Sequence, residues 1–239
     1  MRIGTNPFNS LPPATKTLIG LFVGFYALSY IFGPLLNVYF GLVPLLTLSK
    51  LWLWQPFTYM FLHGSFFHLF FNGFALWMFG SILENLWGTS KFVRFYIICG
   101  LGAALAQVLL KPYSPVPVIG ASGAIYGLLA AFAVEFPEAV VYVYFLFPLK
   151  ARTMAIALCA IEFAASFNTG SHIANLAHLG GLITGLLYLK LPQWLGRLKP
   201  PRREPDVNAL LEKIHSRGVE SLSEREREMM DAYSRRMRE

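Results

Sequence analysis

Apolar residues dominate the first 190 positions and fall into six long runs, separated by short polar or proline-containing stretches. A transmembrane helix needs about 20 mainly apolar residues. The runs therefore predict spanning helices within residues 17–40, 65–87, 92–110, 121–136, 149–167 and 173–191. The fourth run is short, so we expect neighbouring helices, not lipid, to bury its ends. This pattern predicts an all-α membrane protein built as a bundle of six transmembrane helices.

The pattern changes after residue 192, where polar residues take over. Residues 1–16 are expected to be a cytoplasmic N-terminal segment, residues 17–192 the membrane domain and residues 193–239 a cytoplasmic tail. A linker, PPRREP, leads into two predicted short helices, 206–215 and 224–233, which we expect to form a helical hairpin. Ser223 followed by Glu226 predicts a capping box. A solvated appendage and a regulatory or partner-binding element both remain open for this tail.

Composition supports the membrane assignment and fixes an orientation. The chain is 55% hydrophobic and 14% charged, whereas soluble domains carry roughly 25% charged residues. With the N-terminus inside, all of the 20 Lys and Arg residues except Lys50 and Lys111 lie on the inner side. Because positive residues favour the cytoplasmic side, both termini are expected in the cytoplasm, in a bacterium at the inner membrane. The net charge of +7 therefore gives no indication of nucleic-acid binding.

Polar residues gather where the second, fourth and sixth predicted spans begin. These spans run in the same direction, so their first turns lie at one depth near the outer face. Every histidine but one lies in these turns: His63, His68, His172 and His178. Polar groups inside a membrane are costly and usually functional. Cys99 and Cys159 lie within apolar runs and are interpreted as small buried hydrophobes; no metal site, disulfide or cofactor is predicted.

Ser122 and His178 are the candidate catalytic pair. Small residues flank both positions, which lets the fourth and sixth spans approach closely: Gly120, Gly123, Gly181 and Gly185. Such packing predicts that the imidazole lies about 2.6–3.2 Å from the serine hydroxyl, the reach needed to activate a weak nucleophile. Taken singly, the serine is also explained by close helix packing, and the histidine by a structural hydrogen bond.

Three further residues complete the candidate site. Tyr126 lies one turn after Ser122 and is expected to pack its ring against the imidazole. His68 and Asn72 share one face of the second span, and with the Ser122 N–H they predict an oxyanion hole. The alternative for Asn72 is a structural bridge between two helices.

No carboxylate is expected beside the pair. Glu84, Glu135 and Glu138 fall near the inner side, and Glu162, deep in the fifth span, is the one exception. We therefore predict a Ser-His dyad in which something other than a carboxylate orients His178.

Residues 54–189 resemble the rhomboid family. The resemblance rests on Thr58-x-x-Phe61-Leu62-His63-x4-His68-Leu69-x-x-Asn72, Gly120-x-Ser122-Gly123 and Ala177-His178-x-x-Gly181-x-x-x-Gly185, in the expected order. It implies an intramembrane serine endopeptidase that cleaves single-pass membrane proteins near the outer face. Ser122 would be the nucleophile, His178 the general base, and His68 and Asn72 part of the oxyanion hole. The chain departs from the family at Gln55, where many members carry arginine.

Two other classes of function compete with proteolysis. A non-catalytic rhomboid-like scaffold would bind client membrane proteins, but such relatives typically lack the serine or the histidine. A transporter or channel would show inverted repeats or interrupted helices, and no clear repeat is found. The predicted partners are single-pass membrane proteins and the lipid bilayer, without nucleic acid; no oligomeric state is predicted.

Overall fold

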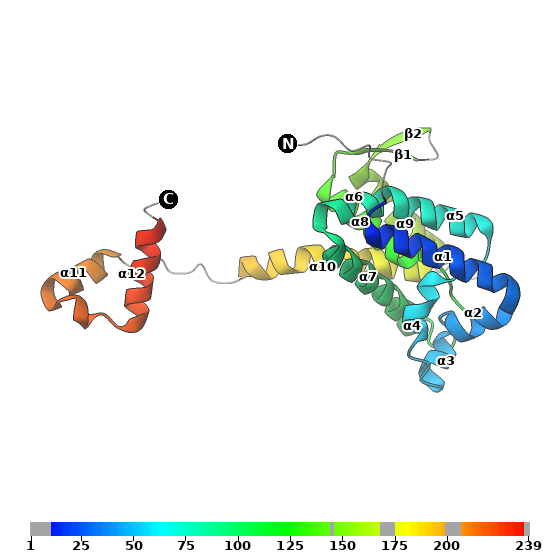
Figure 1. Cartoon of the computed structure of the whole chain (residues 1–239), viewed down its shortest axis with the longest axis horizontal. Coiled ribbons are helices and arrows are strands. Elements are labelled where there is room, and N and C mark those ends of the chain that lie inside the picture. The colour runs from blue at the N-terminus through cyan, green and yellow to red at the C-terminus, as the bar shows by residue number, and fades with distance from the viewer. Residues whose placement is uncertain (1–10, 144–145, 168–174, 199–206, 237–239) are drawn as a thin grey trace. The chain divides into compact units, whose positions relative to one another are not determined.

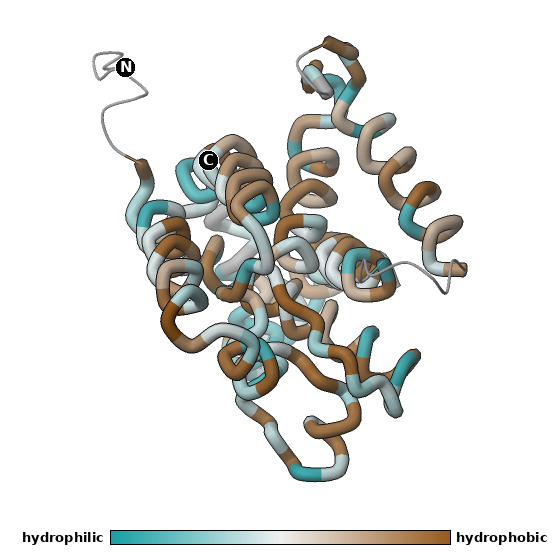
Figure 2. The backbone as a smooth tube through the Cα atoms, turned by 90° about the vertical axis from the view of Figure 1, so that its right-hand side faces the viewer, coloured by the Kyte–Doolittle hydropathy of each residue, from teal (hydrophilic) through white to brown (hydrophobic). Residues whose placement is uncertain are grey.

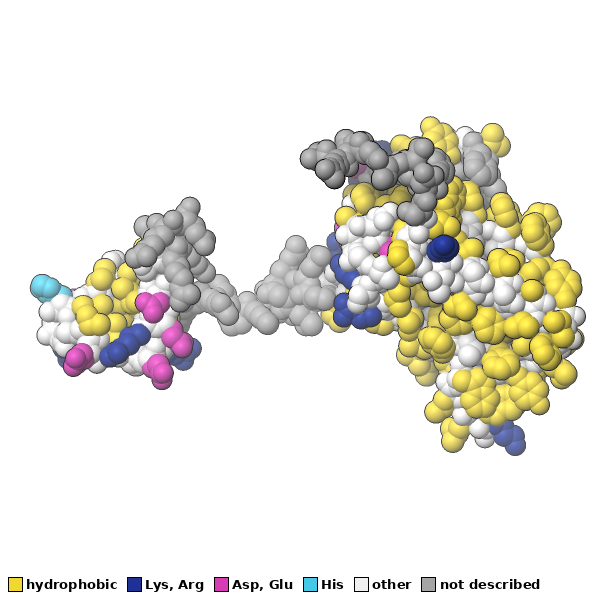
Figure 3. All heavy atoms as spheres, viewed as in Figure 1, with side chains coloured by type: hydrophobic (Ala, Val, Ile, Leu, Met, Phe, Trp, Pro, Cys, Tyr) yellow, Lys and Arg dark blue, Asp and Glu magenta, His cyan; other side chains and the backbone are white. Residues whose placement is uncertain are grey.

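The computed structural model describes residues 11–143, 146–167, 175–198 and 207–236. The chain divides into two compact units, one through Trp194 and the other from Leu195. The first unit is built mainly of helices, whose apolar residues appear brown along the tube in Figure 2. The face of this unit seen in Figure 3 is largely covered by hydrophobic side chains.

The first predicted span is divided into two helices. Helix α1 (Pro13–Phe32) ends at Gly33, whose φ of 55° only glycine adopts readily, and α2 (Pro34–Phe40) then begins with a proline. The predicted span was placed within residues 17–40; the observed helix α1 begins four residues earlier and stops at Phe32, where the Gly-Pro pair ends it. Two short helices follow, α3 (Pro44–Ser49) and α4 (Gln55–Thr58), and then one 3₁₀ turn, η1 (Tyr59–Phe61).

Gln55 organises this first loop. Its side chain is fully buried. Its Oε1 accepts hydrogen bonds from the Val43 N–H at 3.1 Å and the Thr47 hydroxyl at 3.0 Å, and its Nε2 donates to the Val38 carbonyl at 2.8 Å. The amide can serve as donor and acceptor at once, so glutamine ties three parts of the loop together where an arginine could only donate.

Among the residues that the structure describes, three stretches are long and apolar enough to cross a membrane: Pro13–Phe32, Phe66–Trp87 and Thr89–Leu110. The second combines α5 (Phe66–Ala75), a π turn, η2 (Leu76–Gly80), and α6 (Ser81–Trp87); the third is α7. The fourth predicted span is α8 (Ser122–Glu135), and most of its residues are buried by neighbouring helices. The expectation that neighbours bury the ends of this helix holds at its start, where Gly123 and Ala124 are buried, but not at its other end, where Glu135 is exposed.

A β-hairpin was not predicted. Strands β1 (Val140–Val143) and β2 (Phe147–Lys150) pair antiparallel, with Val140 opposite Lys150. The expectation of an all-α fold is wrong here, because a run of β-branched and aromatic residues between two prolines favours a strand. Glu138 beside the hairpin pairs with Lys150 at 2.7 Å and Arg152 at 2.8 Å. Figure 1 places the hairpin and α3 at opposite ends of the unit.

Two more helices complete the first unit. Helix α9 (Ala151–Ala165) begins directly after β2, two residues later than the predicted span. Helix α10 (Asn175–Leu198) extends seven residues beyond the predicted end at 191. The first residues of the sixth predicted span, His172 among them, lie outside the described residues, as does the PPRREP linker.

The second unit contains α11 (Val207–Arg217), a 3₁₀ turn, η3 (Val219–Ser221), and α12 (Glu224–Arg236). The predicted capping box is present: the Ser223 hydroxyl accepts from the Glu226 N–H at 3.3 Å, and the Glu226 carboxylate accepts from the Ser223 N–H at 2.8 Å. Leu210 and Leu222 are buried between the helices, and Lys213 of α11 donates to Glu226 of α12 at 2.8 Å.

Candidate active site

Ser122 is the first residue of α8, so its own N–H has no partner within the helix. Gly120 precedes it with φ of 121°, a backbone conformation that side chains rarely adopt. A Cβ at Gly120 would also lie 2.6 Å from Nε2 of His68. Glycine at this position therefore sets the turn into α8 and lets the His68 ring approach the start of that helix.

Helices α8 and α10 meet through backbone, without intervening side chains. A Cβ at Gly181 would lie 1.8 Å from the Gly123 carbonyl oxygen, and one at Gly185 would lie 3.0 Å from the Gly127 carbonyl oxygen. Close approach of this kind needs small residues on both helices. His178, one turn before Gly181, is thereby carried to the level of Ser122.

The two candidate catalytic side chains are in contact. His178 Nε2 lies 2.7 Å from Ser122 Oγ, a hydrogen-bonding distance. Tyr126 covers the imidazole: the two rings are nearly parallel, with an angle of 6° and centroids 4.4 Å apart. The ring plane of His178 is thus held by stacking while its Nε2 faces the hydroxyl.

A carboxylate lies on the other side of the imidazole. Glu162 of α9 places Oε1 2.9 Å from His178 Nδ1, although the direction of this contact falls outside hydrogen-bond geometry. The Tyr126 hydroxyl donates to the same Oε1, and Asn175 Nδ2 donates to Oε2 at 2.5 Å. The expectation that no carboxylate accompanies the pair is therefore wrong. The sequence did carry a signal for this contact: Glu162 is an acid within an apolar span, and an acid in that setting needs polar partners.

His68 lies beside the start of α8, whereas the hydrogen bond of Asn72 stays within its own helix. Ser65 caps α5 by accepting from the His68 N–H at 3.2 Å. The Gly64 N–H approaches His68 Nδ1 at 3.5 Å, which leaves the opposite nitrogen, Nε2, facing Gly120. The Asn72 amide donates to the His68 carbonyl at 2.9 Å and keeps a second N–H.

His63, the remaining histidine of the second span, packs between aromatic rings. Its ring lies 5.0 Å from that of His68 and 4.9 Å from that of Phe22, and it is 2% exposed. Within the part of the chain that the structure describes, no three His, Cys, Asp or Glu side chains gather as a metal site.

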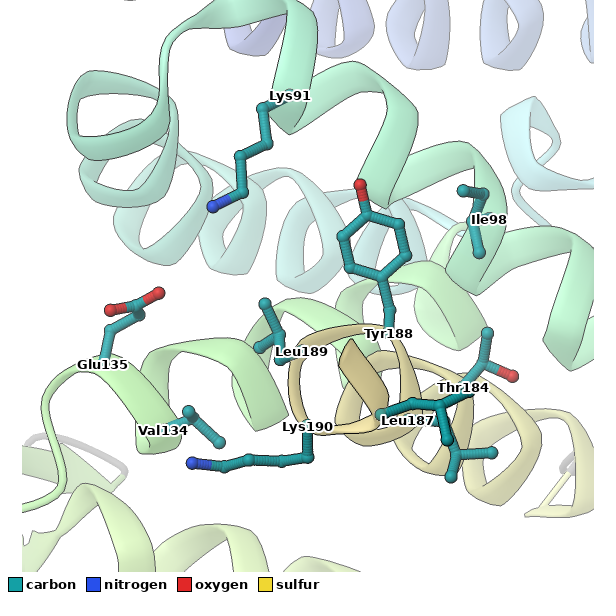
Figure 4. Close-up of a pocket in the computed structure, with 10 residues that line it drawn as sticks. Lys91, Ile98, Val134, Glu135, Thr184, Leu187, Tyr188, Leu189 and Lys190 are labelled. Carbon is teal, nitrogen blue, oxygen red and sulfur yellow. The ribbon is translucent and has the colours of Figure 1, made fainter. Parts of the chain in front are cut away.

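A separate pocket lies between the first half of α7, the end of α8 and the middle of α10 (Figure 4). Lys91 and Glu135 both contact Trp87 there: the ammonium lies 4.7 Å from the ring centroid, and the indole N–H donates to the carboxylate at 3.0 Å. Neither Ser122 nor His178 lines this pocket. It is a feature of the opposite end of α8 from the serine–histidine pair.

The fold and the site together define a helical membrane protein with a serine and a histidine in contact at the start of two closely packed helices. The Rhomboid domain family matches residues 50–192, and the chain belongs to the rhomboid family. A second family, of unknown function, matches residues 201–236.

Similar curated proteins are named as rhomboid proteins. The chain is 34% identical over 136 residues to the rhomboid protease GluP of Bacillus subtilis, an alignment that covers 55% of this chain and 24% of that protein. It is 33% identical over 135 residues to mitochondrial rhomboid protein 1 of Saccharomyces cerevisiae, covering 54% and 38%. It is 32% identical over 135 residues to the human mitochondrial presenilin-associated rhomboid-like protein, covering 54% and 35%. The aligned part is thus well under half the length of each relative.

Proposed function

We propose that this chain is an intramembrane serine endopeptidase that cleaves single-pass membrane proteins near the outer face of the membrane. The observation that carries the proposal is the 2.7 Å contact between Ser122 Oγ and His178 Nε2. A free hydroxyl is a weak nucleophile at neutral pH, and a base within hydrogen-bonding reach activates it. Helices α8 and α10, packed backbone to backbone, hold this geometry before any substrate arrives.

The reaction proceeds in two steps. Ser122 Oγ attacks the substrate carbonyl carbon while His178 Nε2 takes the hydroxyl proton. The resulting imidazolium gives this proton to the leaving amine, and an acyl-enzyme remains. Water then attacks the ester, with His178 again serving as base, and releases the new carboxyl end. The peptide bond must be locally unwound, since a substrate helix keeps its backbone carbonyls hydrogen-bonded.

His68, Asn72 and the Ser122 N–H are proposed as the donors that stabilise the oxyanion. Support comes from the position of His68 Nε2 next to Gly120 and from the first N–H of α8, which has no partner within its helix. Each such donor typically contributes about 10²–10³ in rate. Tyr126, stacked on the imidazole, keeps the base facing the serine.

The proposed setting is a bacterial inner membrane. Residues 17–192 would form a membrane domain of six spanning helices, and residues 193–239 a cytoplasmic helical appendage. Support comes from the excess of Lys and Arg on the side of both termini. In this orientation the first turns of α5 and α8, and His178 with them, face the outer side.

A fluorophosphonate probe tests the proposal, because it forms a covalent adduct only with an activated serine. We expect the wild-type chain in detergent to be labelled, with the adduct mapped to Ser122 by mass spectrometry. Ser122→Ala should abolish labelling. A wild-type chain that stays unlabelled, or a Ser122→Ala variant labelled as fast as wild type, would overturn the assignment.

A further inference from the structure

Among the described residues, Glu162 is the buried acid that contacts the candidate base. Its side chain is 8% exposed, and that of His178 is 12% exposed. Burying a charge is costly unless it is paired, and this carboxylate has three polar neighbours. The Tyr126 hydroxyl and the Asn175 amide donate to it, and His178 Nδ1 lies 2.9 Å from it. Two of these neighbours contact it from α10 and one from α8, while Glu162 itself lies on α9.

We propose that Glu162 is a positioning residue that works through His178, so that the pair operates as a serine–histidine–glutamate triad; this inference rests on the proposed function. The Tyr126 hydroxyl and the Asn175 amide donate to the carboxylate, and His178 Nδ1 lies 2.9 Å from it without hydrogen-bond geometry. An acceptor-only group at this position favours the tautomer with the proton on Nδ1, which leaves the Nε2 lone pair free to take the proton of Ser122.

The geometry gives the carboxylate two tasks. First, it holds the imidazole in the tautomer that can act as a base. Second, its negative charge lies 2.9 Å from the ring that becomes an imidazolium as Ser122 attacks, and it stabilises that charge without itself accepting the proton. Catalytic hydrogen bonds are often poorly aligned in a free enzyme and improve when substrate binds, so the oblique direction of this contact is compatible with the role.

The partners of Glu162 also explain why the carboxylate stays in place. Tyr126 both stacks on the His178 ring and donates to Glu162 Oε1, so one side chain fixes the plane of the base and the acid behind it. Asn175 lies one turn before His178 on α10 and holds the other carboxylate oxygen. The three helices α8, α9 and α10 thereby meet at a single carboxylate.

A purely structural role, in which Glu162 only fastens α9 to its neighbours, makes a different prediction. The other buried carboxylate of this kind is Glu84, which accepts from the N–H groups of Ala14 and Thr15 and from the hydroxyls of Thr15 and Thr89. It contacts neither Ser122 nor His178. Glu84→Gln is therefore a matched control for Glu162→Gln: it makes the same chemical change in a buried acid that also accepts several hydrogen bonds.

The test compares wild type, Glu162→Gln and Glu84→Gln in the rate of fluorophosphonate labelling and in cleavage of a single-pass reporter substrate. A glutamine at position 162 carries no charge. In either orientation its amide N–H₂ group faces at least one neighbour that donated to, or lay beside, the carboxylate. We expect Glu162→Gln to lower kcat and the labelling rate about 10²–10⁴-fold, the range that general-base catalysis contributes, with KM changed less than about threefold. Glu84→Gln should leave the labelling rate of the folded fraction near that of wild type.

Nitrogen NMR supplies a readout that a structural role would not change. With ¹⁵N-labelled histidine and His178→Ala for assignment, His178 should show a protonated Nδ1 in wild type and a mixture of tautomers, or protonated Nε2, in Glu162→Gln. Should the glutamine variant fail to fold, Glu162→Asp keeps the charge and should retain part of the activity.

The outcomes separate the two proposals. A wild-type chain that is not labelled defeats the proposed function itself. A labelled wild type with a Glu162→Gln variant that labels within threefold of it, and an unchanged histidine spectrum, defeats the triad while leaving the serine–histidine pair in place.

Discussion

Replacing Gly181 by alanine should separate the candidate base from its serine without touching either residue. The new Cβ would lie 1.8 Å from the Gly123 carbonyl oxygen, and ordinary contact begins at 3.4 Å. Helix α10 must therefore move away from α8 by about 1.6 Å at this point. Added to a hydrogen bond of 2.7 Å, a shift of this size puts Nε2 roughly 4 Å from Oγ, beyond hydrogen-bonding reach.

The expected result is a loss of about 10²-fold or more in the rate of fluorophosphonate labelling, since general-base assistance typically contributes 10²–10⁴-fold. Two further glycines make the test graded. At Gly185 a Cβ would lie 3.0 Å from the Gly127 oxygen, so a shift of a few tenths of an ångström suffices and the loss should be smaller. At Gly24 nothing lies within 4 Å, and alanine should not lower the rate.

The assay measures labelling rates of the three variants in detergent, normalised to the folded fraction from gel filtration and thermal unfolding. The reasoning is refuted if folded Gly181→Ala labels as fast as Gly24→Ala. It is equally refuted if Gly185→Ala is the slower of the two close-contact variants. If Gly181→Ala does not fold, the comparison of Gly185→Ala with Gly24→Ala carries the test.

Two other predictions concern the first loop and the tail. Gln55→Ala removes the hydrogen-bond partner of the Thr47 hydroxyl, the Val43 N–H and the Val38 carbonyl. Because each buried unsatisfied group costs about 1–3 kcal/mol, the variant should have a measurably lower midpoint of thermal unfolding. An unchanged midpoint would contradict the described role of Gln55 in the loop. The hydrogen bond from Lys213 has the largest effect on the pKa of Glu226, and those from Ser223 come next; together they lower this pKa from an ordinary 4.5 to about 2. A depressed folded pKa means that the contact between α11 and α12 is fully supported above about pH 4.5 and is lost as the pH falls from there through about 2. A ¹³C carboxyl titration of the full chain should show this, whereas a midpoint near 4.5 would disprove it.

The extent of the long helices was predictable because apolar runs set it directly. Helix α7 and the stretch Phe66–Trp87 lie within three residues of the predicted bounds. The break at Gly33 and the hairpin at residues 140–150 were missed, since hydropathy alone does not distinguish a bent span from a straight one or a short apolar strand from the start of a helix. Both carry local signals, a Gly-Pro pair and a β-branched run, that outweighed the apolar pattern.

The contact between Ser122 and His178 follows from two features visible in the sequence, equal depth in parallel spans and glycines on the facing sides. Glu162 could be named from the sequence only as a possible exception. Its rotation about the α9 axis depends on how α9 packs, and a span that is apolar all round gives no face to orient it. The role of Gln55 likewise depends on loop contacts that no periodicity encodes.

Cleavage in a bilayer tests the central claim most directly. The purified chain is reconstituted into liposomes with a single-pass reporter substrate, and product is quantified for wild type, Ser122→Ala and His178→Ala. We predict one cut near the outer end of the substrate helix by wild type and no product above background from either variant. Cleavage that persists in Ser122→Ala would contradict the account. So would a wild-type chain that leaves the reporter intact and whose Ser122 is not labelled by the fluorophosphonate probe.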